Sequence, residues 1–382
     1  MIKDQDVYRK SSQQEFITKE LIEQNQFIDY QGLNHGYHNR QLRLDHFIKN
    51  FRPVFGVLQE KPDYEKNHQD VDQGILDFNQ YHQVNDVKLG HFQLHECVVA
   101  LSNKDILYTS DRGLSHFDMV SGKNRMIMEA EKVESINYSK RLNMVTGCSN
   151  NTSIYVYDIL NEKSVLNEKL IPQADLINGS IFVDDPSDSI LACGNYKSVL
   201  HYDLVKKKSI KMIDSIHYVN QIAYKPDNKL IAFAMDDVDI QIKNLNDPQC
   251  NIILKGHEDY NFAVKFMDEY KIATGSQDVS TRIWDLRKPE KELHVLGGFN
   301  SEVGAFCYCP KRKVLFCCEN FTYIYAYDFS ESIIKRRTFD FFSLISGIAL
   351  SPDGNSLFGG LTTYKNGIVK FDIKDPVWED VE

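Results

Sequence analysis

The sequence has no excess of basic residues and no long apolar run. It carries 44 Lys and Arg against 54 Asp and Glu, so the formal net charge is -10, which argues against a basic nucleic-acid-binding protein. No stretch of about 18 apolar residues occurs, so we expect no membrane insertion. The first residues, Met-Ile-Lys-Asp-Gln-Asp, lack the features of a secretory signal. We therefore expect an intracellular protein, in the cytoplasm, the nucleus or both.

The common catalytic motifs are also missing. The sequence contains no Gly-x-Ser-x-Gly, no phosphate loop ending in Gly-Lys-Ser or Gly-Lys-Thr, and no His-Glu-x-x-His. We therefore expect neither enzymatic activity nor a cofactor. Two short basic runs, 206–208 and 335–337, leave a nucleic-acid-associated protein as an alternative. A hydrolase is a further alternative. We expect both runs to be solvated turns in an acidic chain.

The eight cysteines do not form a metal-binding pattern. Cys307 and Cys309 share one face of a strand, whereas the adjacent Cys317 and Cys318 point to opposite faces. Four converging thiolates are therefore not expected, and no metal site is predicted. In a reducing compartment these residues are expected to be free, buried and structural.

The chain does contain a long-period repeat. Short strand patterns recur seven times, and all but the fourth end in an aromatic residue followed by Asp. Asp118 to Asp158 spans 40 residues, Asp158 to Asp203 spans 45, and the later intervals fall between these values. This is the period of a four-stranded propeller blade, and the β-branched runs between turn residues predict an all-β, seven-bladed propeller. The endings are Phe117-Asp118, Tyr157-Asp158, Tyr202-Asp203, Lys243-Asn244, Trp284-Asp285, Tyr327-Asp328 and Phe371-Asp372.

The repeat divides the chain into an arm, a ring and a tail. The propeller is predicted at 81–376, preceded by a partly helical arm at 1–80 and followed by an acidic tail at 377–382. A capping box predicts a helix from Ser12, and an apolar face predicts another at 40–51. These helices either pack on the ring or bind a partner. A ring must close its last blade, and we expect a strand near 85–89 to do so.

The fifth repeat begins Gly256-His257, ends Trp284-Asp285, and resembles the WD-repeat family. In that family four side chains form a hydrogen-bonded chain that fixes each blade, which is the structural role that the resemblance implies here. The matching residues are His257, Thr274, Asp278 and Trp284.

A closer resemblance is to a poorly characterised family of fungal and plant WD-repeat proteins with an amino-terminal arm, and it implies a scaffold without a settled activity. It departs from the usual pattern at 268–270 and in several lost Trp-Asp endings. The stretches that carry it are 29–32, 91–94, 256–263, 273–278, 340–342 and 345–348.

Two surfaces are candidates for binding other proteins. The loops of the fourth and fifth blades are expected to gather an acidic and aromatic patch that accepts a basic segment; the alternative is a solvated rim. Separately, Trp284-Asp285-Leu286-Arg287 resembles the Trp-Asp-x-Arg box of cullin-RING ubiquitin ligase receptors, which implies that Arg287 contacts the ligase adaptor. We expect a monomer within a larger complex. The patch comprises His217, Tyr218, Asp236, Asp237, Glu258, Asp259 and Tyr260.

Overall fold

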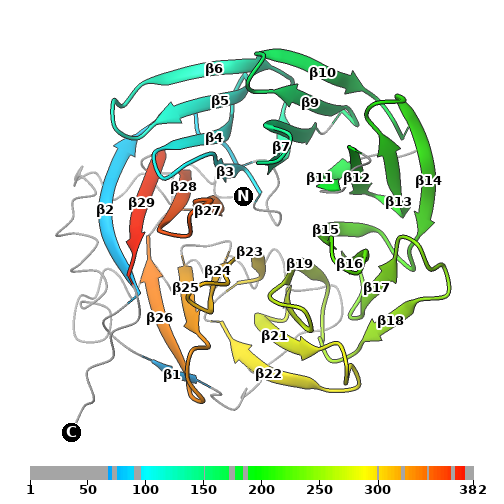
Figure 1. Cartoon of the computed structure of the whole chain (residues 1–382). Helices are drawn as coiled ribbons and strands as arrows, with labels where there is room; N and C mark the ends of the chain where they lie inside the picture. Colours follow the sequence, from blue (N-terminus) through cyan, green and yellow to red (C-terminus); the bar gives the residue numbers. More distant parts are fainter. Residues whose placement is uncertain are drawn as a thin grey trace, which may run out of the picture.

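The described residues form seven sheets arranged as the blades of a ring (Figure 1). The structure is a computed structural model, and it describes residues 68–70, 75–89, 96–149, 151–171, 177–183, 188–298, 301–319, 323–341, 344–362 and 366–374. Every regular element in these ranges is a strand. The all-β, seven-bladed fold predicted from the repeat is therefore confirmed. The two predicted helices and the acidic tail lie outside the described residues.

The first four blades each use four consecutive strands. Blade 1 comprises β3 (Val98–Ala100), β4 (Asp105–Ser110), β5 (Gly113–Asp118) and β6 (Asn124–Glu129). Blade 2 comprises β7 (Val133–Ser139), β8 (Met144–Ser149), β9 (Ile154–Asp158) and β10 (Lys163–Glu168). Blade 3 comprises β11 (Ile177–Val183), β12 (Ser189–Gly194), β13 (Tyr196–Asp203) and β14 (Lys208–Asp214). Blade 4 comprises β15 (Val219–Lys225), β16 (Leu230–Met235), β17 (Ile240–Asn244) and β18 (Asn251–Leu254).

The last three blades complete the ring. Blade 5 comprises β19 (Asn261–Phe266), β20 (Lys271–Ser276), β21 (Ser280–Asp285) and β22 (Glu292–Gly297). Blade 6 comprises β23 (Val303–Cys309), β24 (Val314–Glu319), β25 (Tyr323–Asp328) and β26 (Ile334–Asp340), with the short β1 (His68–Asp70) beside β26. Blade 7 comprises β27 (Leu344–Leu350), β28 (Ser356–Thr362), β29 (Gly367–Ile373) and, from the other end of the chain, β2 (Leu76–Gln83).

The strand that closes the ring is not the predicted one. β2 pairs antiparallel with β29, from Leu76 opposite Ile373 to Gln83 opposite Gly367. Residues 85–89 instead form a turn with a single bridge from Val87 to Ser110, so the prediction of a strand there, and of a propeller that starts at 81, is wrong. The reason is local, because the Asn-Asp pair at 85–86 favours a turn, whereas Leu76 lies buried in the core.

The basic run at 335–337 is also not a solvated turn. It lies within β26, and β1 pairs with it in parallel. Arg336 is only 5% exposed; it donates to the carbonyl of Gly297 at 2.8 Å and lies over the ring of Tyr325. The guanidinium is buried there because it has both a carbonyl acceptor and an aromatic face.

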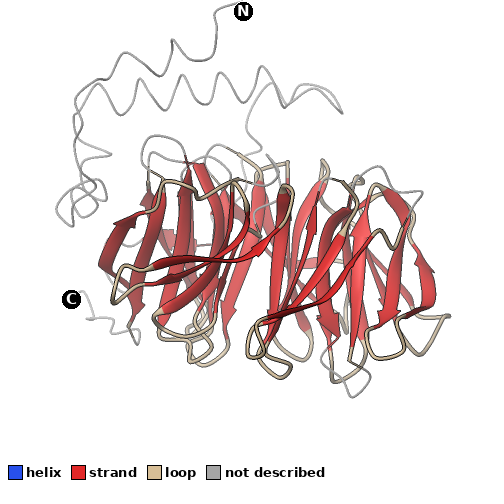
Figure 2. Cartoon of the chain, turned by 90° about the horizontal axis from the view of Figure 1, so that it is seen from above, coloured by secondary structure: helices blue, strands red, loops and turns tan. Residues whose placement is uncertain are grey.

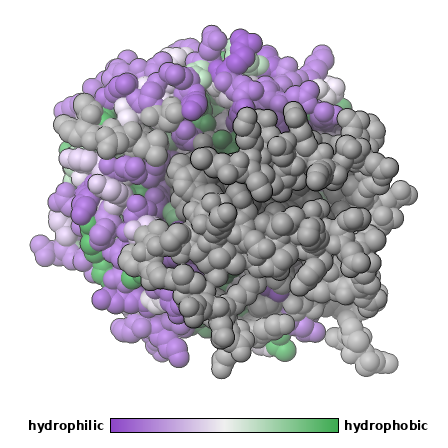
Figure 3. Space-filling model, turned by 180° about the vertical axis from the view of Figure 1, so that it is seen from behind, coloured by the Kyte–Doolittle hydropathy of each residue, from purple (hydrophilic) through white to green (hydrophobic). Residues whose placement is uncertain are grey.

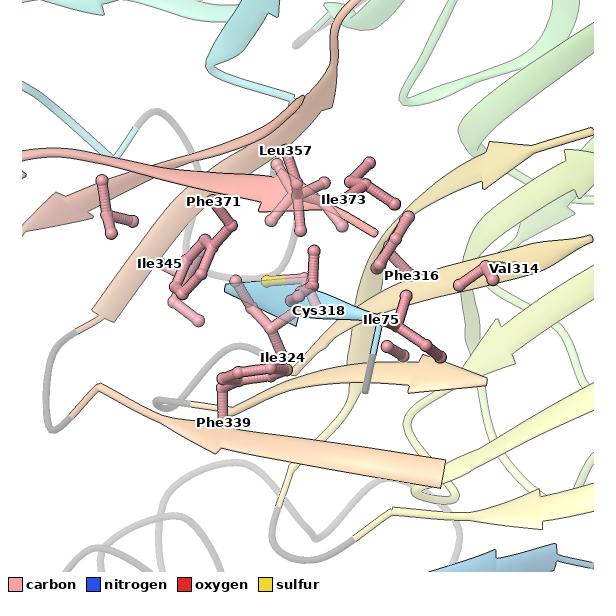
Figure 4. Packing of buried hydrophobic residues seen from close by; sticks show 14 of the residues in the cluster. Ile75, Val314, Phe316, Cys318, Ile324, Phe339, Ile345, Leu357, Phe371 and Ile373 are labelled. Atoms are coloured by element: carbon pink, nitrogen blue, oxygen red, sulfur yellow. The ribbon is translucent and has the colours of Figure 1, made fainter. Parts of the chain in front are cut away.

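The core is made of apolar clusters between neighbouring blades. In the largest, side chains of blades 6 and 7 meet around Phe316, Leu357 and Phe371 (Figure 4). Cys318 is fully buried in this cluster, and all eight cysteines are free. Among the described residues no group of three metal-ligating side chains is found.

The ring has two flat faces, and each face is formed by a different set of loops between the strands. Figure 2 shows the ring from the side, with loops above and below the strands. We call the face at which the first strand of each blade begins the start face, and the face at which the third strand ends the end face.

Viewed from the side opposite to Figure 1, the described periphery is mostly hydrophilic (Figure 3). The part of the chain that the structure describes contains no helix with the length and apolar character that a membrane crossing requires.

The first strands share one irregularity that shapes the start face. β7, β11, β15, β19 and β23 each have a register shift immediately after their first residue, and β27 has one after its second. A bulge adds an unpaired residue and re-aims its side chain, which is common beside functional sites. Glu134, Asn178 and Asn220 occupy this position in blades 2, 3 and 4.

Candidate functional site

The four tetrad side chains of blade 5 form one buried hydrogen-bonded chain. His257 Nδ1 lies 2.9 Å from Asp278 Oδ2, and His257 Nε2 lies 2.8 Å from Thr274 Oγ1. The indole N–H of Trp284 donates to the same Thr274 oxygen at 2.8 Å. His257 is 5% exposed, and the other three side chains are fully buried. Both ring nitrogens of His257 are occupied, so the geometry fits a structural role.

Asp278 is the buried carboxylate of this hydrogen-bonded chain. Burial by itself would raise the pKa of Asp278, but His257, the Ser280 hydroxyl and the Glu258 amide lower it to about 2. The Ser280 hydroxyl donates at 2.6 Å and the Glu258 N–H at 3.0 Å. A buried carboxylate stays ionised when such donors surround it. Asp278 therefore anchors the loop before β19 to the turn after β20.

Asp at the equivalent position of other blades does not have these partners. Asp111 of blade 1 pairs with Lys88 at 2.5 Å, and both side chains are about half exposed. Asp237 of blade 4 accepts the N–H of Val238 at 2.7 Å and lies 3.5 Å from the His217 ring, but this pair is partly exposed. Sequence position alone therefore does not identify a tetrad.

The predicted patch is assembled at the start face between blades 4 and 5. His217 Nε2 lies 3.5 Å from Asp237 Oδ2, and Asn220 donates to Asp236 Oδ1 at 2.9 Å. Asn261 donates to the carbonyl of Asp237 at 2.6 Å and so ties the two blades together. The structure thus brings the loops before β15 and after β16 into contact with the start of β19.

The Tyr260 phenol lies close to the acidic side chains of the patch. Its pKa is raised by burial first, and then by Asp236, Asp259 and Asp237. Burial also raises the pKa of Asp236, while Asn220 and His217 lower it. The half-buried phenol therefore lies close to three carboxylates and shares their negative potential.

The remaining patch residues differ in exposure. Tyr218 is 43% exposed, and Glu258 is also exposed. Asp259 is only 7% exposed and accepts the N–H of Tyr260 at 2.8 Å. It therefore contributes charge from beneath the surface and offers little area to a partner.

Sequence analysis missed a second group of acids at the inner strands. Glu96, two residues before β3, accepts from Gln221 Nε2 at 2.7 Å, which connects blade 1 to blade 4. Burial raises the pKa of Glu96 to about 7, although Lys265 and Gln221 lower it. Burial also raises the pKa of Glu134 to about 7 and that of Glu302 to about 8. The sequence feature that could have indicated Glu134 is its position in the repeat, because it is the second residue of the first strand of its blade.

Arg287 lies on the opposite, end face. Its Nε donates to Asp285 Oδ1 at 2.8 Å and its Nη2 to Asp285 Oδ2 at 2.5 Å. The guanidinium stands 4.4 Å from the ring centroid of Tyr270, yet the side chain is 60% exposed. The Arg287 side chain and amide are the first causes that lower the pKa of Asp285 to about 2. Arg287 is thus held in place and still accessible.

Comparison with known proteins returns a partial similarity. No protein-family model matches the chain. The chain is 24% identical over 137 residues to DDB1- and CUL4-associated factor 10 of Mus musculus, covering 35% of this chain and 24% of that protein. It is 25% identical over 137 residues to the Xenopus laevis protein of the same name, covering 35% of this chain and 29% of the relative. The match thus spans less than a third of these relatives.

Proposed function

We propose that the protein is a non-catalytic intracellular scaffold whose start face binds a basic segment of another protein. The observation that carries this proposal is the convergence of Asp236, Asp237 and the half-buried Tyr260 between blades 4 and 5. A rigid ring with loops on both faces is well suited to present such a surface. Membership in the fungal and plant family is part of the same proposal.

The chemistry of the patch favours a cationic partner. Burial raises the pKa of the Asp236 carboxyl, and Asn220 and His217 offset this only in part, so a Lys or Arg from a partner would supply further positive charge. Tyr218 and Tyr260 add aromatic faces that attract a cation. A merely solvated rim would not need Asn220 and Asn261 to hold these acids together.

The test removes charge and preserves shape. We expect Asp236→Asn combined with Asp237→Asn to lower affinity for Lys- and Arg-containing peptides on an array about tenfold. Asp259 is left unchanged because it is buried. The matched control is Asp227→Asn with Glu269→Gln, which removes the same charge from exposed residues of the end face. Equal binding by both variants would reject the patch.

A second candidate function is substrate receptor of a cullin-RING ubiquitin ligase, with Arg287 contacting the adaptor. Two observations favour it: the exposed, Asp285-held guanidinium, and the similarity to proteins named as DDB1- and CUL4-associated factors. Arg suits such a contact because its fork can bind carboxylates in two places.

Affinity purification with mass spectrometry from the native cell compares wild type, Arg287→Ala and the control Lys288→Ala. Loss of a ligase adaptor and its cullin from Arg287→Ala alone would support the receptor. An unchanged set of partners would remove Arg287 from consideration. Recovery of no partner by any of the three proteins would contradict the scaffold itself.

A further inference from the structure

Three exposed aliphatic side chains occupy one structural position in three neighbouring blades. Val120 is 77% exposed, Leu160 76% and Val205 73%, and they are the most exposed large apolar residues of the described chain. The next, Ile333, is 58% exposed. Each of the three follows the Asp that ends the third strand of blade 1, 2 or 3. They therefore project from the end face, opposite to the acidic patch.

Hydrogen bonds to that Asp fix the turns. Asp118 Oδ1 accepts the N–H of Val120 at 2.8 Å, and Asp203 Oδ1 accepts the N–H of Val205 at 3.0 Å. Asp158 likewise accepts backbone N–H groups of its turn, and these bonds contribute to its lowered pKa. Such turns hold the residue at the tip away from the strands.

The backbone shows that the three turns are equivalent. Four residues after the Asp, each turn has a residue in the left-handed region, at the last position of a four-residue hairpin loop. These residues are Gly122 with φ 68°, Glu162 with φ 49° and Lys207 with φ 50°. Because the blades are repeated about the ring, equivalent turns place their tips at one level of the end face.

Each apolar tip is followed by a lysine at the same spacing. Lys123, Lys163 and Lys208 stand three residues after the three tips, and all are exposed. Lys163 also lowers the pKa of Asp158 electrostatically, from the end of the same turn. The pattern of an aliphatic tip with a lysine beside it therefore occurs three times along one arc.

The other described turns of this face lack the pattern. The equivalent tip is Asn246 in blade 4, Arg287 in blade 5 and Ser330 in blade 6. Each tip residue donates its N–H to the Asn or Asp before it, as in blades 1 and 3. This backbone hydrogen bond is therefore common, whereas an apolar residue at the tip position occurs only in blades 1 to 3 among the described turns; the exposed Ile333 of blade 6 lies three residues beyond its tip.

We propose that the arc of blades 1 to 3 docks on the surface of an anionic lipid bilayer. The three tips come from separate turns at one level, and a bilayer is a continuous plane that can receive all of them together. Aliphatic side chains gain by entering the headgroup boundary, and the neighbouring lysines are attracted by anionic lipids. No segment crosses the bilayer in this arrangement. The start face stays free to bind a protein.

Sedimentation of the full chain with vesicles tests the proposal. Wild type is expected to sediment with phosphatidylcholine vesicles containing phosphatidylserine, to remain in solution with phosphatidylcholine alone, and to be released by salt. The triple variant Val120→Ser, Leu160→Ser, Val205→Ser should bind about tenfold more weakly. Lys123→Glu, Lys163→Glu, Lys208→Glu should abolish the preference for phosphatidylserine.

The control removes three exposed apolar side chains from the outer strands β6 and β14, with Met126→Ser, Ile210→Ser and Met212→Ser. It should bind vesicles within about twofold of wild type. Three results would overturn the proposal: no binding of wild type to anionic vesicles, equal loss in control and tip variants, or binding lost only when Asp236 and Asp237 are changed. Capture by polyglutamate without vesicle binding would indicate an acidic protein partner instead.

Discussion

Blades 5 and 6 are neighbours with the same strand order and two different cores. In blade 5, Ile272 lies opposite Trp284 and Thr274 opposite Arg282. In blade 6 the equivalent pairs are Leu315 with Tyr327 and Cys317 with Tyr325. In blade 5 the polar tetrad connects the loop before β19 with β20, the turn after it and β21. Blade 6 has a sulfur at the position of the central Thr274 hydroxyl.

Blade 6 uses aromatic packing and one buried acid in place of the tetrad. Tyr323, Tyr325 and Tyr327 follow one another with ring centroids 6.1 and 6.0 Å apart. Glu319 is fully buried and accepts the Tyr325 hydroxyl at 2.6 Å. The comparison shows that a blade needs a filled interior and satisfied polar groups, whereas the identity of those groups is free to vary.

The largest difference should come from removing the buried charge of blade 5. Asp278→Ala leaves His257 without its carboxylate partner, and we expect the free energy of unfolding to fall by about 3–5 kcal/mol. Asp237→Ala, at the equivalent position of blade 4, is more exposed and should cost less than about 1 kcal/mol. Urea denaturation of both variants measures this, and equal losses would show that the tetrad contributes nothing special.

A smaller difference should separate the central positions of the two blades. Thr274→Val keeps the side-chain shape but removes the oxygen that His257 and Trp284 share, so we expect a loss of about 2–3 kcal/mol. Cys317→Val changes an apolar site by one methyl group and should cost less than about 1.5 kcal/mol. Thermal unfolding of the two variants ranks their losses of stability. A larger loss for Cys317→Val than for Thr274→Val would contradict a stabilising role for the hydrogen bonds to Thr274.

The last expected difference is one of pH dependence, spread over several pH units. Asp278, with its pKa lowered to about 2, contributes stability that is present above pH 4 and is lost as the pH falls toward 2. Glu302, beside blade 6, has its pKa raised to about 8, so its contribution is full below about pH 4.5 and is lost as the pH rises toward 8. Glu302→Gln should therefore reduce the loss of stability between pH 5 and 8 by about 1 kcal/mol per pH unit. An unchanged slope would mean that Glu302 is not protonated in the folded protein.

Much of the architecture could be predicted from local patterns. In the first six repeats the residue that ends the repeat also ends a strand, β5, β9, β13, β17, β21 or β25, because a strand and its turn are specified by neighbouring residues. The loops gathered at blades 4 and 5 could be predicted in the same way, since the repeat fixes which loops share a face. The exposure of Asp259 and the partners of Asp111 could not, because they depend on which side chains a neighbouring blade presents.

The sequence by itself determined the number of blades, the limits of most strands, the residues of the blade 5 tetrad, and the acidic balance of the chain. Only the tertiary structure decided that β2 closes the ring, that Arg336 is buried, and that Glu96 reaches Gln221 across blades. It also decided that Val120, Leu160 and Val205 are the most exposed large apolar side chains of the described residues. Alternation and turn chemistry act over a few residues, whereas burial and charge environment depend on segments that meet only when the ring closes.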